Sequence, residues 1–138
     1  MSRHYAEPVR APVQARTPEE AQALAGLSFD DQVMFGRLRR DVPGHIGDGH
    51  VLHAMAEAKR SDIPDASSVG GVMMFGDSIR VMGNGEGAPS ARIYVSQPAP
   101  RPEVSVAAIQ SQNQQAIDLQ VAEQHAQSPQ HGSGLRIG

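Results

Sequence analysis

The first half of the chain carries apolar residues at intervals of three and four, the spacing of amphipathic helices. Three helices are predicted: a short one capped by Thr17 that stops at Gly26, a second capped by Ser28 that ends before Pro43, and a third over 49–60. Ser or Thr before a helix accepts a backbone N–H, and glycine favours its end. The boundaries of these helices therefore follow from local chemistry.

The spacing also predicts which side of each helix is buried. In the second helix the expected inward residues are Phe29, Val33, Met34 and Leu38. In the third helix, which Asp48 is expected to cap, the inward residues are Val51, Leu52, Met55 and Ala58, while Glu57, Lys59 and Arg60 face water. Four of the five aromatic residues are assigned to a core between about residues 18 and 96: Phe29, Phe35, Phe75 and Tyr94.

Beyond Pro64 the period of the pattern changes to two, which is typical of strands. Residues 69–75 and 78–82 are separated by Gly76-Asp77, a strong hairpin signal, and a glycine-rich loop over 83–87 leads to a third strand at 92–95. The predicted fold class is α+β, with two or three N-terminal helices packed on one face of a small antiparallel three-stranded sheet.

The two ends of the chain lack such patterns. Residues 1–16 hold two prolines without periodicity and are expected to be a disordered lead, ahead of a compact domain over 17–102. Residues 103–138 are expected to be a glutamine-rich flexible tail. Its apolar residues have roughly helical spacing up to 127, but Gln112, Asn113 and Gln114 interrupt them, so at most partial helicity is expected. Deleting this tail should leave folding cooperative.

Composition narrows the function classes. A net charge of −3 and a pI near 6.0 argue against a nucleic-acid binder. The basic cluster Arg37, Arg39 and Arg40 is flanked by aspartates and is interpreted as a solvated helix end. The chain has no cysteine, which excludes disulfides and thiol chemistry. No apolar run approaches a membrane span, and Met1 leads into no signal region, so no membrane insertion is expected.

Candidate chemistry is sparse. His50 and His53 are three residues apart near His45 and Asp48, but no further metal ligands are evident, so ordinary histidines are expected. The loop over 83–87 leads into a strand, whereas phosphate-binding loops lead into a helix. Met73, Met74 and Met82 are expected to fill the core rather than form an adaptable contact surface. No catalytic motif is present, so neither an enzyme nor a cofactor is expected.

Five segments in a fixed order carry a family resemblance. They are the helical run 30–39, the alanine-rich run 51–59, the strand ending Ile79-Arg80-Val81-Met82-Gly83, the run Arg92-Ile93-Tyr94-Val95, and Pro102-Glu103-Val104-Ser105 with the glutamine-rich segment behind it. Over about residues 28–127 this order resembles the C-terminal recruitment domain of Xanthomonadales-type antibacterial type IV secretion effectors.

The resemblance implies a function in binding. Such a domain binds the cytosolic helical domain of the coupling ATPase and targets the effector for export into rival bacteria. It implies a monomer that resides in the bacterial cytoplasm before export and needs no N-terminal signal peptide. Because nothing before residue 17 could be a toxic domain, the chain is expected to be an excised recruitment domain or a small stand-alone substrate. The expected contact residues are Arg92, Tyr94, Glu103, Val104, Ser105, Gln110, Gln112, Gln114 and Gln115.

Two other function classes remain open at this point. One is a small α+β interaction module that homodimerises through the open edge of its sheet and has no secretion role. The other is an enzyme or metal protein that uses His45, His50 and His53.

Overall fold

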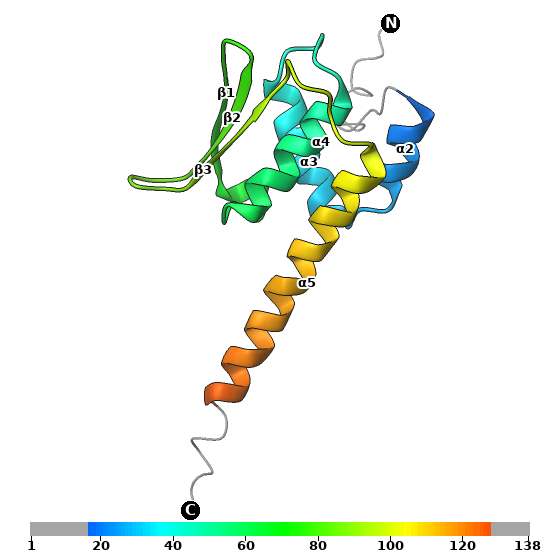
Figure 1. Ribbon diagram of the computed structural model, residues 1–138. Helices are drawn as coiled ribbons and strands as arrows, with labels where there is room; N and C mark the ends of the chain where they lie inside the picture. Colours follow the sequence, from blue (N-terminus) through cyan, green and yellow to red (C-terminus); the bar gives the residue numbers. More distant parts are fainter. Residues whose placement is uncertain (1–16, 128–138) are drawn as a thin grey trace, which may run out of the picture.

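A computed structural model describes residues 17–127, and the expected disordered segments 1–16 and 128–138 lie outside them. The predicted fold class is confirmed: the chain is an α+β protein with a three-stranded antiparallel sheet (Figure 1). Its elements are α2 (Pro18–Ala25), α3 (Phe29–Asp41), α4 (Asp48–Arg60), the short 3-10 helix η1 (Ala66–Ser68), β1 (Val69–Phe75), β2 (Ser78–Gly83), β3 (Ser90–Tyr94) and α5 (Pro102–Gln127).

Local signals set the first two helix starts as predicted. The Thr17 hydroxyl accepts the backbone N–H of Glu20 at 3.1 Å, and the Ser28 hydroxyl accepts that of Asp31 at 3.2 Å. The start of α4 is different, and the prediction that Asp48 caps it is wrong. Gly47 is the N-cap without a side-chain bond, and Asp48 is the first helical residue, fully buried. Its carboxylate forms an ion pair with the Arg39 guanidinium, as described below.

The sheet has the order β1-β2-β3, with both pairs antiparallel. Phe75 pairs with Ser78, which leaves a two-residue turn, and Gly76 has the positive φ of +60° that such a turn requires. On the inner face Ile79 lies opposite Ile93, and this face packs on α4. The hairpin expected from Gly76-Asp77 is therefore confirmed.

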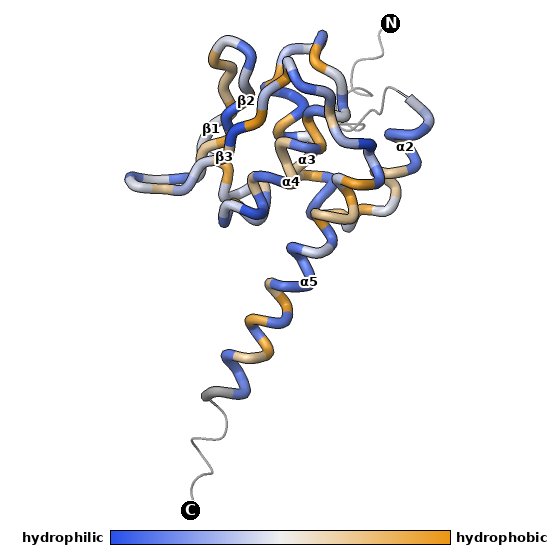
Figure 2. Tube along the Cα trace, in the orientation of Figure 1, coloured by the Kyte–Doolittle hydropathy of each residue, from blue (hydrophilic) through white to orange (hydrophobic). Residues whose placement is uncertain are grey.

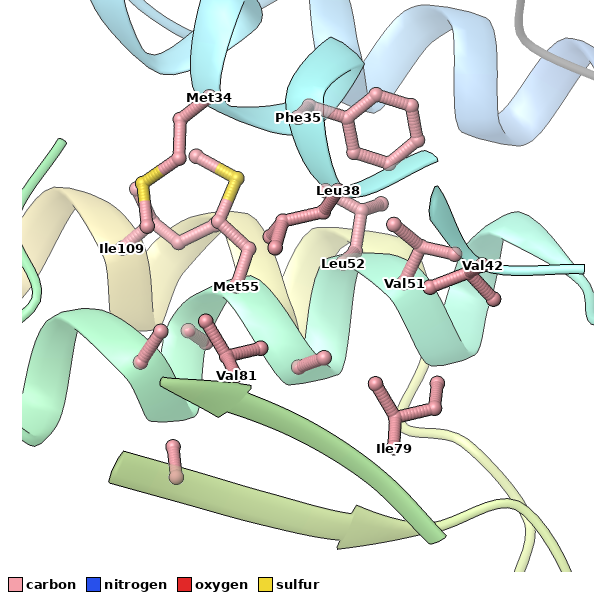
Figure 3. Close-up of a cluster of buried hydrophobic side chains, with 14 of the residues drawn as sticks. Met34, Phe35, Leu38, Val42, Val51, Leu52, Met55, Ile79, Val81 and Ile109 are labelled. Atoms are coloured by element: carbon pink, nitrogen blue, oxygen red, sulfur yellow. The ribbon is translucent and has the colours of Figure 1, made fainter. Parts of the chain in front are cut away.

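Helix α4 lies at the centre of the fold, in contact with β2 and β3 on one side and with α3 and α5 on others. In Figure 1 the sheet and α5 extend on different sides of the helical layer. Figure 3 shows how the core side chains meet across these elements. They come from α3 (Met34, Phe35, Leu38), α4 (Val51, Leu52, Met55), β2 (Ile79, Val81) and α5 (Ile109).

Helix α5 is longer and better packed than expected. It is one continuous helix of 26 residues, and its first half docks on the domain with Val106 and Ile109 buried. The core therefore extends past its expected limit at residue 96. Glutamine is a good helix former, so the polar run does not end the helix. Beyond residue 113 every described side chain of α5 is exposed, and the helix leaves the globular part (Figure 1).

The inward face of α3 was predicted incorrectly in part. Met34 and Leu38 are buried, but Phe29 is 78% exposed and Val33 is also exposed, while Phe35 is fully buried. Among the four aromatic residues assigned to the core, only Phe35 belongs to it. The buried side of α3 also carries Asp31, whose partners are described below.

Candidate partner-binding surfaces

The face of the sheet turned away from α4 carries cationic and apolar side chains. Strand register brings Met73 opposite Arg80, Arg80 opposite Arg92, and both Phe75 and Tyr94 opposite Ser78. Because side chains alternate along a strand, these residues share one face. We define the outer sheet face by its six large members, Met73, Phe75, Arg80, Met82, Arg92 and Tyr94.

Within residues 17–127 the two arginines on this face interact with aromatic neighbours. The Arg80 guanidinium carbon lies 5.1 Å from the centroid of the Phe75 ring. Arg92 donates from Nη1 to the Tyr94 hydroxyl oxygen at 3.3 Å. No ion pair joins Arg80 or Arg92 to a carboxylate within residues 17–127. Phe75 is 47% and Tyr94 is 43% exposed, so aromatic rings border two guanidinium groups that pair with no carboxylate of residues 17–127.

The methionines divide between the two faces. Met74 packs against the core, as expected, while Met73 is exposed on the outer sheet face and Met82 is half-buried there. The prediction that all three fill the core is therefore wrong for Met73 and Met82. In β1 the period-two alternation places neighbouring methionines on opposite sides of the sheet.

The expected contact residues do not form one surface. Arg92 and Tyr94 lie on the outer sheet face, and the remaining seven lie on α5. Helix α4 contacts both β3 and α5 and so lies between the two groups. In the first turn of α5, Glu103 and Val104 are exposed, but Ser105 is only 2% exposed. Ser105 belongs to the packed side of α5, one position before Val106, and cannot meet a partner without movement of the helix.

The glutamines of α5 line two grooves. Glu103 and Gln110 border a cavity of about 540 Å³ between α2 and α5, where Gln110 also donates to the Gly26 carbonyl oxygen at 3.0 Å. Gln112 and Gln115 border a cavity of about 470 Å³ beside the end of α4. Farther along, Gln114 bonds to Asp118 on the same helix at 3.0 Å. Gln110, Gln112 and Gln115 thus line grooves, and Gln114 lies on the helix surface.

The exposed half of α5 carries a second set of apolar residues. Ile117, Leu119 and Val121 are each about half or more exposed. Figure 2 shows hydrophobic and hydrophilic residues alternating along this part of the helix without one continuous apolar stripe. The exposed apolar residues of this half of α5 are therefore less clustered than those of the outer sheet face.

A buried polar cluster joins three helices. The Lys59 ammonium donates to the Asp31 carboxylate at 2.8 Å and to the Pro64 carbonyl oxygen at 2.8 Å, and the Asn113 side-chain amide donates to the other Asp31 oxygen at 2.7 Å. The prediction that Lys59 faces water is wrong, because its charge is paired inside the domain. These partners are up to 82 positions apart in the sequence, so no local pattern reveals them.

Arg39 fixes the loop between α3 and α4. It donates to the carbonyl oxygens of Ile46 and Pro43, each at 2.8 Å, and to the Asp48 carboxylate at 2.6 Å. The interpretation of the basic cluster as a solvated helix end is therefore wrong for Arg39, although Arg40 is exposed. A guanidinium can satisfy several carbonyl oxygens at once, which explains why an arginine stands here.

The histidines do not converge on a metal site. The His50 Nε2 atom lies 2.7 Å from the Gln97 carbonyl oxygen, and His45 is exposed on the loop before α4. Burial lowers the pKa of His53, an effect that nearby Glu57 partly offsets. Within residues 17–127 no three His, Cys, Asp or Glu side chains gather closely enough to hold a metal ion.

The loop over 83–87 joins β2 to β3, as expected, and Gly85 and Gly87 adopt positive φ angles within it. A search of the described helices for one long and apolar enough to cross a membrane finds none. Comparison of this chain with protein-family models, with curated proteins and with solved structures finds no match.

Proposed function

We propose that this chain is a recruitment domain that binds the cytosolic helical domain of a type IV coupling ATPase and thereby directs its effector to export into rival bacteria. The observation that carries the proposal is the outer sheet face, where Arg92 and Tyr94 stand exposed beside one another. Both belong to the run 92–95, one of the five segments on which the resemblance rests. In this proposal the protein is a monomer in the cytoplasm before it binds the ATPase.

The distribution of polar groups supports a binding role rather than catalysis. The buried charged side chains, Asp31, Asp48 and Lys59, all form ion pairs that hold helices together. Exposed Tyr, Phe, Met and Arg side chains, by contrast, gather on one face of the sheet, and these residue types are enriched in protein interfaces. A sheet face with exposed aromatic and guanidinium groups is suited to another protein surface.

The edge of β1 favours a second candidate, a module that homodimerises. Within the described residues β1 pairs only with β2, and its sequence from Val69 to Phe75 holds no charged residue. Long uncharged edge strands tend to pair with other chains. The register shift between Val69 and Gly71 opposes this pairing, because a bulge disrupts the row of backbone groups at one end of the edge. Size-exclusion chromatography coupled to light scattering distinguishes a stable dimer from a monomer.

The decisive experiment is an NMR titration of the labelled full chain with the soluble helical domain of a type IV coupling ATPase. We expect shifts in β3 and the first turn of α5, and a loss of affinity of about tenfold for Tyr94→Ala. The matched control is Phe29→Ala, which removes a still more exposed aromatic ring from α3, 78% exposed against 43% for Tyr94. A spectrum that stays unchanged at high ATPase concentration would contradict the proposal.

A further inference from the structure

The outer sheet face contains an arrangement that costs stability in the free domain. Arg80 and Arg92 are directly opposite on neighbouring strands, and neither forms an ion pair with a carboxylate of the described residues. Like charges directly opposite each other on neighbouring strands destabilise a sheet. The one acidic residue of the β1–β2 hairpin, Asp77, instead accepts a hydrogen bond from the Ser96 hydroxyl at 2.7 Å. An anion placed between the two guanidinium groups would remove this repulsion.

Within residues 17–127 the chain places no carboxylate on this arginine pair. The segments 1–16 and 128–138 hold four arginines and a single glutamate, so their charge has the same sign as the face. A second copy packed face to face would add two more arginines to the pair. Charge complementarity therefore points to a different molecule that carries negative groups.

Nucleic acid fits this face less well than an acidic protein. The chain has a net charge of −3, and the face presents two cations, whereas affinity for nucleic acid grows with the number of phosphates neutralised. Large apolar side chains form the rest of the face, with Met73, Phe75 and Tyr94 each more than 40% exposed. A protein segment that presents both carboxylates and apolar side chains matches this mixture.

We infer that the outer sheet face docks an acidic amphipathic segment of a partner protein. Its carboxylates would bind Arg80 and Arg92, and its apolar side chains would cover Phe75, Tyr94 and the methionines. The Cα atoms of residues directly opposite on antiparallel strands are about 5 Å apart. The Cβ atoms of positions i and i+4 on a helix are about 5–6 Å apart, so two carboxylates with that spacing match the two arginines. The identity of the partner protein in this inference rests on the proposed function. The chemistry of the docked segment does not.

The test uses the labelled full chain and a synthetic amphipathic helical peptide of about 18 residues with a glutamate face and a leucine face. We expect shifts confined to the outer sheet face, several-fold weaker binding when salt rises from about 0.05 to 0.3 M, and no shifts with the peptide that carries lysine in place of glutamate. The double variant Arg80→Gln/Arg92→Gln should lose affinity about tenfold or more. Arg40→Gln, which removes an exposed arginine from α3, should bind as the parent chain does.

Three results would overturn the inference: equal affinity of the double variant for the glutamate peptide, shifts that map only to α5, or tighter binding to an oligothymidylate than to the peptide. Titration with the ATPase domain separates the two proposals. If that domain binds the double variant and the parent equally, the inference fails and the recruitment function stands. If the peptide binds the outer sheet face and the ATPase domain does not bind at all, the inference stands and the recruitment function fails.

Discussion

Replacing Ile109 with alanine tests whether α5 is part of the core. Ile109 is completely buried between α5 and the other helices, 13 residues beyond the expected end of the core at residue 96. Removing a buried isoleucine side chain down to alanine costs about 2–5 kcal/mol in unfolding free energy. A domain of this size has a total stability of about 5–15 kcal/mol, so the variant should lose a large share of it.

The assay is urea unfolding followed by circular dichroism. With an unfolding slope of about 1.5 kcal/mol per molar urea, a loss of 2–5 kcal/mol lowers the midpoint by about 1–3 M. Where Ile109→Ala does not fold at all, Ile109→Val still gives a measurable result, with an expected cost of about 0.5–1.5 kcal/mol.

Ile117→Ala is the matched control, since it makes the same change on the same helix at a side chain that is 51% exposed. Lost contacts there are offset by the better helix propensity of alanine, so its unfolding free energy should stay within about 0.5 kcal/mol of the parent. Equal midpoints for the two alanine variants would refute the placement of α5 in the core. The same reasoning reverses the expectation for the tail: deletion from residue 103 should abolish cooperative folding, because it removes Ile109 and Val106.

Three further outcomes follow from other parts of the fold. Lys59→Met should cost about 3–5 kcal/mol in chemical unfolding because it leaves the Asp31 carboxylate buried without its cation, and adding Asp31→Leu should recover part of that loss. Gly70→Ala should lower the thermal midpoint, since its new methyl group would collide with a backbone carbonyl of β2, whereas Gly71→Ala meets only the tip of a methionine side chain; similar midpoints would contradict this. Because burial lowers the pKa of His53 in the folded state, its contribution to stability is complete above the unfolded value near 6.5 and is lost as pH falls, so His53→Gln should flatten the decline in stability between about pH 7 and 5.

The elements of this fold were predictable because their signals are local. Thr17 and Ser28 cap helices through residues three positions away, and Gly76 sets the hairpin turn by its own backbone angle. The α+β class then follows from the change of period near Pro64.

The errors arise where distant residues meet. Lys59 has the sequence context of a surface lysine, and only the approach of Asp31, 28 positions away, explains its burial. In the sequence Asn113 interrupts the apolar spacing of α5. In the fold its side-chain amide donates a hydrogen bond to the Asp31 carboxylate. Pattern reading treats each polar side chain as facing water and cannot pair two of them inside the core.

The outer sheet face was predictable only in pieces. Alternation in β2 already separated Arg80 from Ile79 and Val81, and Arg92 and Tyr94 were named as contact residues from the resemblance. That Arg80 lies opposite Arg92 depends on the register between β2 and β3, which the irregular loop over 83–87 does not specify.

The docking of α5 on the rest of the domain also has a consequence for the order of events on the ribosome. Synthesis delivers α2, α3, α4 and the sheet before α5, yet these elements together still lack Ile109 and the amide of Asn113. The nascent domain therefore carries an open apolar seam along α4 and an incompletely bonded Asp31 until about residue 113 leaves the exit tunnel. At about 5–20 residues per second, that last stretch beyond β3 takes on the order of seconds, during which the unfinished seam is accessible to chaperones.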